Sequence, residues 1–283
     1  MDAQLLSVEI VTASAATAAV IINLSKQTAS AGFTIAGATG NYVNTITGSA
    51  GADGITGGSG DDIFNGYIGD DTINGASGTD TLVLTGSITT SDTNRLVSVE
   101  NVSAATLTTA VVIDLRNESE AETITGGGGA DKIYGGSEGD TISAGAGADY
   151  IKGGAGADSL TGGLGANTYD YVQFNDSLGA NYDIIADFKT GDRFKIGHTI
   201  AAANLQTASG TGTGALLTDL GTVLTSSNFI ASAATLVTLT GGTDAGRYLV
   251  LNDATTAFAA TTGHDAVIKL SGAVAVTSSA FIA

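Results

Sequence analysis

Two arrays of a nine-residue repeat, rich in glycine and aspartate, restrict the fold of this chain more than any other feature of its sequence. The first array runs from Gly48 to Val83 as GSAGADGIT, GGSGDDIFN, GYIGDDTIN and GASGTDTLV. The second runs from Gly126 to Asp170 as GGGGADKIY, GGSEGDTIS, AGAGADYIK, GGAGADSLT and GGLGANTYD. A short fixed period of this kind predicts a solenoid, because one apolar residue per repeat is buried only when successive coils stack.

The positions of the repeat differ in chemical character. Glycine recurs at positions 1, 2 and 4, where we expect a backbone of positive φ that lets carbonyl groups crowd together. The residue at position 8 is apolar and predicts the buried centre of a three-residue strand. Two repeats make one coil of eighteen residues, so equivalent side chains of successive coils lie about 4.8 Å apart. The position-8 residues are Ile55, Phe64, Ile73, Leu82, Ile133, Ile142, Ile151, Leu160 and Tyr169.

Position 6 carries aspartate in eight of the nine repeats and asparagine in the last. Unit charges about 4 Å apart repel by roughly 1 kcal/mol in water, so stacked carboxylates need a cation between them. Carboxylate and carbonyl oxygens are the ligands that Ca²⁺ prefers. A flexible acidic linker is the alternative, but it would not keep position 6 acidic while position 8 stays apolar. The predicted stacked pairs are Asp53 with Asp71, Asp62 with Asp80, Asp131 with Asp149 and Asp140 with Asp158. The predicted calcium ligands are these eight aspartates and Asn167.

The repeats resemble those of the RTX (repeats-in-toxin) proteins. The resemblance implies a right-handed parallel β-roll that binds calcium, and export from Gram-negative cells through a type I secretion channel. We therefore predict an all-β fold, a right-handed parallel β-roll or β-solenoid with a C-terminal β-rich cap and secretion domain. Two features depart from the family pattern. Glu138 stands at position 4 of GGSEGD, and position 2 of the first array reads Ser49, Gly58, Tyr67 and Ala76.

A longer duplication surrounds the arrays. Leu5–Ser25 and Leu96–Arg116 align without a gap through a shared Leu-x-Ser-Val-Glu-x-Val core and a Val-x-Ile-x-Leu strand. The unit of about ninety residues is thus used twice, and we expect wider coils of the same solenoid outside the arrays. Glu9 and Glu100 of this core are expected to be structural residues at a strand edge, not catalytic ones. Because the chain starts inside a long repeat, we expect it to be a piece of a longer protein or to begin with an imperfect cap over residues 1–30.

The sequence divides into six predicted segments. Asp183 and Asp187 of the fifth segment are candidates for one more ion site or for surface positions. In the sixth segment, Arg247–Asp253 and His264–Leu270 predict paired strands, and the segment resembles the C-terminal region of type I secreted proteins, particularly surface-layer proteins. The segments are a partial solenoid repeat (1–47), the first array (48–83), wider coils (84–125), the second array (126–170), a strand–turn–strand cap (171–197) and a β-rich type I secretion domain (198–283).

Composition excludes several classes of protein. The formal charge of −18, with ten Lys plus Arg, argues against binding to nucleic acid and to anionic membranes. The absence of cysteine excludes disulfides and thiol chemistry. The longest apolar run, Ala15 to Leu24, is too short to span a bilayer. No basic region precedes the first apolar residues, so we expect no N-terminal secretory signal.

Catalytic motifs are not expected to be functional. Gly135–Gly139 matches the G-x-S-x-G nucleophile motif by letter, but that motif needs a long strand, a helix and a histidine partner. His198 and His264 are the only histidines. We therefore predict no enzyme. The preferred function is a secreted, calcium-binding structural protein of a surface layer or cell surface that self-associates there. The alternative is an export and folding module of a type I secreted enzyme or toxin.

Overall fold

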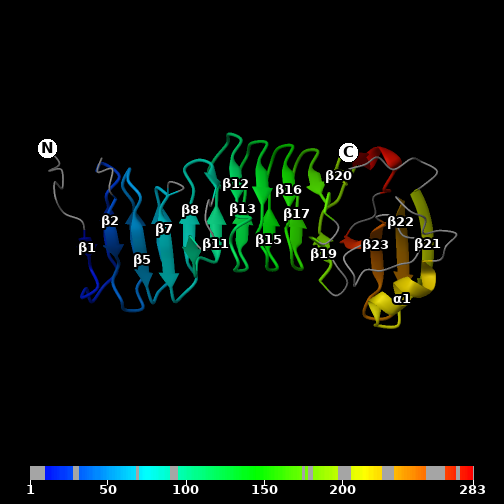
Figure 1. The fold of residues 1–283 in the computed structure, drawn as a ribbon, viewed down its shortest axis with the longest axis horizontal. Coiled ribbons are helices and arrows are strands. Elements are labelled where there is room, and N and C mark those ends of the chain that lie inside the picture. Colours follow the sequence, from blue (N-terminus) through cyan, green and yellow to red (C-terminus); the bar gives the residue numbers. More distant parts are fainter. Residues whose placement is uncertain are drawn as a thin grey trace. The chain divides into compact units, whose positions relative to one another are not determined.

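The computed structural model describes residues 10–27, 32–67, 70–89, 95–173, 176–177, 181–196, 205–224, 233–252, 265–271 and 275–282. The chain divides into two compact units, Met1–Ser137 and Glu138–Ala283. Strands are the main regular secondary structure of both units, and the described residues contain a single α-helix (Figure 1). That helix is neither long nor apolar enough to cross a membrane.

The first unit is built from strands of two to five residues. They are β1 (Ile10–Thr12), β2 (Ile21–Asn23), β3 (Thr34–Ala36), β4 (Thr45–Thr47), β5 (Gly54–Gly58), β6 (Ile63–Asn65), β7 (Thr72–Ala76), β8 (Thr81–Val83), β9 (Ile88–Thr89), β10 (Leu96–Val97), β11 (Asn101–Ser103), β12 (Val112–Asp114), β13 (Thr123–Thr125) and β14 (Lys132–Tyr134). Strands consecutive along the chain mostly enter different sheets. The parallel orders are β1-β3-β5-β7-β10, β2-β4-β6-β8-β11-β13 and β9-β12-β14. Each coil of the first array therefore gives one strand to each of two sheets.

The register of the strands confirms the predicted coil length in the first array. Ile55 lies beside Ile73, and Phe64 lies beside Leu82. All four side chains are buried, because each lies in a short strand and meets its counterpart on the next coil. The strands β5 and β7 have five residues and are longer than the predicted three. The array thus forms a parallel β-roll with one apolar side chain per repeat in its core.

The coils after the first array continue the same stacking with longer turns. Val102 of β11 lies beside Leu82 of β8, and Ile124 of β13 lies beside Val102. Between β8 and β11 the chain forms β10, which pairs with β7, and β9, which pairs with β12. This coil therefore ends one sheet and starts another, while the sheet that contains β8, β11 and β13 runs on.

The second unit begins with the same short strands and ends with longer ones. They are β15 (Thr141–Ser143), β16 (Tyr150–Lys152), β17 (Ser159–Thr161), β18 (Thr168–Asp170), β19 (Asp183–Ile185), β20 (Arg193–Lys195), β21 (Leu205–Thr211), β22 (Ala234–Thr240), β23 (Gly246–Asn252), β24 (Asp265–Leu270) and β25 (Phe281–Ile282), together with the helix α1 (Leu216–Val223) and the 3-10 helix η3 (Ser278–Ala280). Within this unit the sheet orders are β15-β17-β19-β24-β23-β22-β21 and β16-β18-β20-β25.

The predicted cap over residues 171–197 is a further coil of the roll. Ile185 of β19 lies beside Leu160, and Phe194 of β20 lies beside Tyr169. Both strands place an apolar residue in the core as position 8 does, so they extend the two sheets and do not close them. The strands β24 and β25 then add to β19 and β20.

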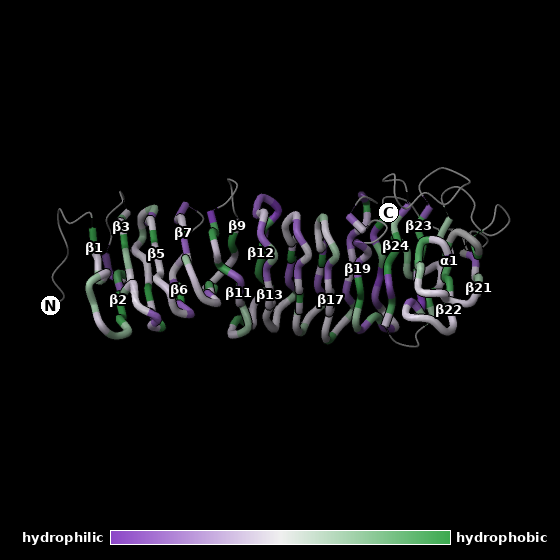
Figure 2. The backbone as a smooth tube through the Cα atoms, turned by 90° about the horizontal axis from the view of Figure 1, so that it is seen from below, coloured by the Kyte–Doolittle hydropathy of each residue, from purple (hydrophilic) through white to green (hydrophobic). Residues whose placement is uncertain are grey.

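The C-terminal part of the second unit has a core of its own. The strand β21 is parallel to β22, whereas β22, β23 and β24 are antiparallel. Leu220 of α1 packs with Val237, Tyr248 and Val267 from these strands. Hydrophobic residues dominate β23 and β24 (Figure 2). The predicted pairing of two strands is thus present between Arg247–Asn252 and Asp265–Leu270. Asp253 and His264, which the prediction included, lie outside the described residues.

Candidate metal centre

The aspartates at position 6 bind the backbone of the preceding coil. In each stacked pair within a unit, the amide at position 6 donates a hydrogen bond to Oδ1 of the position-6 side chain one coil later in the chain. We call this series of side chains the carboxylate ladder. The N···Oδ1 distances are 2.8 Å for Asp53 to Asp71, 2.7 Å for Asp62 to Asp80, 2.8 Å for Asp140 to Asp158 and 3.0 Å for Asp149 to Asn167. The predicted pairing of Asp131 with Asp149 remains a prediction.

The ladder is buried. Side chains of all nine predicted ligands are 0–2% exposed: Asp53, Asp62, Asp71, Asp80, Asp131, Asp140, Asp149, Asp158 and Asn167. A flexible acidic linker would leave these carboxylates in water. Burial of so many acidic groups is costly unless hydrogen bonds and a cation compensate for the lost hydration.

We call each side chain of the ladder, together with the turn of the coil that it joins, a rung. In several rungs one carboxylate oxygen has no hydrogen-bond donor among the described residues. Oδ2 of Asp62, Asp80 and Asp158 is buried without a hydrogen-bond donor among the described residues. Burial raises the pKa of Asp80 to about 6, against an ordinary value of 3.8. Burial also raises the pKa of Asp158 to about 7, with a further contribution from the charge of Asp140. Without a cation, burial therefore disfavours the ionised form of these carboxylates.

Glycine at position 1 makes room for the second oxygen. A Cβ atom on Gly57 would collide with Oδ2 of Asp62 and would lie 2.8 Å from the carbonyl oxygen of Gly75. A Cβ on Gly153 would likewise collide with Oδ2 of Asp158. We expected positive φ at positions 1, 2 and 4. In the last three repeats of the second array the conformation appears at positions 2 and 4. At position 1 it appears for Gly66, whereas Gly57 and Gly153 are restricted by space.

The oxygens that border the ladder fit calcium. Oδ2 of Asp62 and the carbonyl oxygen of Gly75 both lie next to Gly57, so each rung brings a carboxylate and a turn carbonyl together. Among the described residues, no three His, Cys, Asp or Glu side chains gather into one metal-binding group. An ion in the ladder would be held by carboxylate oxygens together with turn carbonyls such as that of Gly75. Calcium accepts such all-oxygen environments, whereas zinc prefers nitrogen and sulfur ligands.

The ladder extends beyond the nonapeptide arrays. Four of the described side chains outside the predicted set make the hydrogen bonds of the ladder and lie two residues before a buried apolar residue of a strand. This spacing is the signal that could have identified them. Asn44 lies before Asp62 in the ladder, and its amide donates to Oδ1 of Asp62 at 2.6 Å. The other three accept the amides of Asp80, Asp158 and Asn167, and they are Glu100 (2.7 Å), Asp183 (3.0 Å) and Asp192 (2.9 Å). Glu100 is thus structural, as expected; Glu9 lies outside the described residues.

The rung at Glu100 reproduces the oxygens of an array rung. A Cβ on Gly75 would collide both with Oδ2 of Asp80 and with the carbonyl oxygen of Ser98. The carbonyl oxygen of Ser98 therefore lies beside Asp80 as the carbonyl oxygen of Gly75 lies beside Asp62. Ser98 reaches it with a φ of 50°, a conformation rare outside glycine. The carboxylate arrangement of the first array therefore recurs in the next coil, which lacks the repeat.

The two remaining candidates from the sequence have different surroundings. Asp183 is buried in the ladder, and its Oδ2 accepts a hydrogen bond from the Tyr171 hydroxyl at 2.8 Å. Asp187 accepts the amides of Gly162 and Gly163 at 2.9 and 2.7 Å. Asp183 is therefore a ladder residue, whereas Asp187 fastens a turn of the second array.

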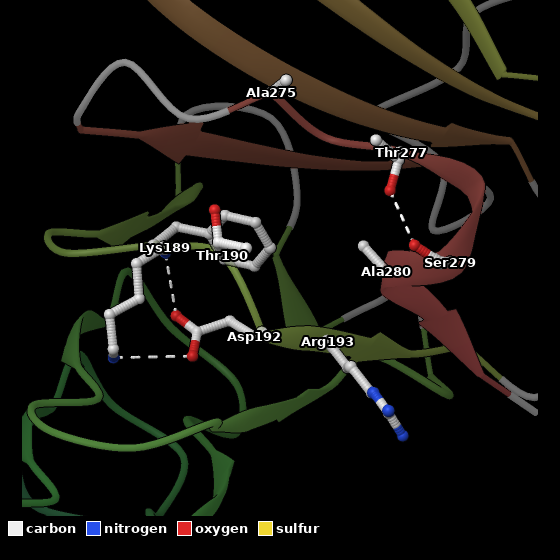
Figure 3. Close-up of a pocket in the computed structure, with 10 residues that line it drawn as sticks. Lys189, Thr190, Asp192, Arg193, Ala275, Thr277, Ser279 and Ala280 are labelled. Atoms are coloured by element: carbon white, nitrogen blue, oxygen red, sulfur yellow. Dashed lines mark hydrogen bonds and ion pairs between the residues drawn. The ribbon is translucent and has the colours of Figure 1, made fainter.

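A lysine compensates the charge at Asp192. Asp192 borders a cavity of about 340 Å³ between the turn before β20 and the segment 275–280. The Lys189 amide donates to Oδ2 of Asp192 at 2.9 Å, and the Lys189 ammonium lies 3.5 Å from Oδ1 (Figure 3). The ammonium also donates to the carbonyl of Gly163. A side-chain cation thus bridges a ladder carboxylate and a turn carbonyl at this rung.

Stacked parallel coils with a buried carboxylate ladder define a calcium-binding β-roll. Four segments of the chain match the family of RTX calcium-binding nonapeptide repeats, at residues 38–73, 47–82, 118–138 and 134–169. The chain therefore contains RTX repeats, and these repeats bind Ca²⁺. No curated protein matches the chain.

Proposed function

We propose that this RTX chain is a secreted structural protein whose calcium-bound roll forms part of a bacterial surface layer or another cell-surface structure. The observation that carries the proposal is the rung formed by Asp80, Ser98 and Glu100. It continues the ladder into coils that lack the nonapeptide, so the roll is not limited to the two arrays. A chain made mainly of roll suits a structural element.

Calcium-coupled folding is part of the proposal. Each unpartnered oxygen on Asp62, Asp80 and Asp158 adds an uncompensated charge to a thin core when calcium is absent. Binding to the folded state alone then adds directly to its stability. The range given for extracellular calcium modules is about 10⁻⁴–10⁻³ M, so the roll would fold after export and not before it.

We further infer that the chain is not an enzyme. The G-x-S-x-G match follows the three-residue strand β14, not a long strand. Within the first unit, the hydroxyl of Ser137 donates to the carbonyl of Glu118 at 3.4 Å. His198 and His264 lie outside the described residues. These contacts suit a turn of the roll.

Self-association through strand edges supports the surface role. Among the described strands, β1 pairs only with β3, and β2 pairs only with β4. Ile10 and Ile21 on these strands are 65% and 82% exposed. Apolar strands with an open edge favour pairing with another chain. The charge of −18 would keep copies apart until calcium neutralises them.

The second candidate is an export and folding module of a secreted enzyme or toxin. Support for it comes from the C-terminal strands, which have their own core around Leu220 and Tyr248. Light scattering and negative-stain microscopy of the full chain separate the two candidates. A structural protein is expected to assemble as calcium rises to millimolar levels. A strictly monomeric species across wide ranges of protein and calcium concentration would leave the export module as the function.

A further inference from the structure

Two acidic residues outside the ladder lie together in the C-terminal part of the second unit. Asp219 belongs to the first turn of α1, and Asp244 belongs to the turn between β22 and β23. The Thr213 amide donates to Oδ2 of Asp219 at 2.7 Å, and the Gly214 amide donates to Oδ1 of Asp244 at 3.1 Å. Consecutive amides thus hold the carboxyl groups side by side, in hydrogen-bonding contact with each other.

Asp244 is buried with an oxygen that nothing satisfies. The residue is 8% exposed, and its Oδ2 has no hydrogen-bond partner among the described residues. Asp219 is 4% exposed and also accepts the Thr213 hydroxyl at 2.8 Å. A second carboxylate beside Asp219 requires a cation or a proton.

Backbone carbonyls border the same pair. A Cβ on Gly212 would collide with Oδ1 of Asp244 and would lie 2.5 Å from the carbonyl oxygen of Gly241. A Cβ on Gly242 would lie 2.6 Å from the carbonyl oxygen of Gly212 and 2.8 Å from Oδ1 of Asp244. The turns on either side of the pair thus bring two carbonyl oxygens close to the carboxylates.

We propose that Asp219 and Asp244 form a calcium site that is separate from the RTX repeats. The site would take both carboxylates and the carbonyls of Gly212 and Gly241, an all-oxygen set that suits calcium. Its occupation would fasten α1 to the turn between β22 and β23, and so complete the C-terminal part of the unit only where calcium is plentiful. The site does not depend on the carboxylate ladder.

Hydrogen–deuterium exchange of the full chain tests the site by itself. Exchange is measured with and without calcium for peptides that cover residues 211–219 and 240–246, and for peptides of the first array. Calcium at about 100 times its dissociation constant stabilises a bound segment enough to slow exchange by about a hundredfold. Asp244→Asn removes one charge, but it keeps an acceptor for the Gly214 amide and adds a donor for Asp219.

Each outcome decides between cation and proton. We expect calcium to protect residues 211–219 and 240–246 in the natural chain and in Asp62→Asn, but not in Asp244→Asn. Loss of protection in the first array of Asp62→Asn checks the ladder in the same experiment. If calcium does not change exchange in these two segments of the natural chain, Asp219 and Asp244 share a proton instead of an ion. That result would overturn the site. Protection that survives Asp244→Asn would overturn it as well.

Discussion

The amide of Asp62 donates a hydrogen bond of 2.7 Å to Oδ1 of Asp80, eighteen residues further along the chain. Oδ1 thereby fastens one coil to the next, while Oδ2 of Asp80 has no hydrogen-bond partner in the part of the chain that the structure describes. An ion that binds Oδ2 therefore stabilises a carboxylate that already joins two coils. Calcium binding at one rung should help to order the coils on both sides, so we expect folding to be cooperative along the roll.

The glycine at position 1 can be tested by a single methyl group. We expect Gly57→Ala to destabilise the calcium-bound chain by about 1–3 kcal/mol, because the new Cβ would collide with Oδ2 of Asp62. Gly54→Ala is the matched control, since nothing lies within 4 Å of its Cβ. Urea unfolding in saturating calcium measures both. Equal effects of the two substitutions would contradict the steric role of position 1.

Glu100 should contribute to calcium binding although it lies outside the repeats. Glu100→Gln removes the charge that accepts the Asp80 amide, and we expect fewer calcium ions per chain in calorimetric titration. Glu138→Gln is the control, because Glu138 is exposed at position 4 of its repeat. Unchanged stoichiometry for both variants would restrict the calcium ladder to the nonapeptides.

The calcium-free chain should be stabilised by acid. Burial raises the pKa of Asp80 to about 6 and that of Asp158 to about 7, from 3.8, so the folded state binds protons more tightly than the unfolded state. The resulting stability is complete below pH 3.8 and is lost as the pH rises through 6 and 7. The far-UV β signal in calcium-depleted buffer should therefore be larger at pH 5 than at pH 8. A β signal that grows as the pH rises would contradict this assignment.

Residues 198–283 are expected to carry the export signal. Deletion is a poor test, because β24 and β25 pair with the last coil of the roll and their loss would expose its strands. Transfer to an unrelated passenger protein is sharper. The fusion should leave a host that has a cognate type I channel, whereas a passenger fused to residues 84–125 should stay inside. Retention of both fusions would refute the proposal.

The sequence predicted the array part of the fold well. Position 8 identified buried strand residues such as Ile73 and Leu82, and the period identified which strands stack. Position 6 identified buried side chains that pair at the expected eighteen-residue step. These features follow from the repeat itself, since identical local geometry recurs in every copy. Whether the roll is right-handed remains a prediction.

Residues outside the repeat were harder to assign. Glu100 joins the ladder because β11 stacks on β8, and its place two residues before the buried Val102 is the only local sign of this role. Asp183 and Asp192 appeared to belong to a cap, whereas their strands form another coil. Asp219 and Asp244 meet only because the chain folds back on itself, which a period cannot reveal.

Circular dichroism with controlled calcium tests the central claim most directly. The full chain in calcium-depleted buffer at neutral pH should give a largely disordered far-UV spectrum. A β spectrum should appear cooperatively as calcium reaches about 10⁻⁴–10⁻³ M. Magnesium at the same concentrations is the control for general charge screening. A calcium-free chain with the same β spectrum and the same Tm as the calcium-saturated chain would contradict calcium-coupled folding.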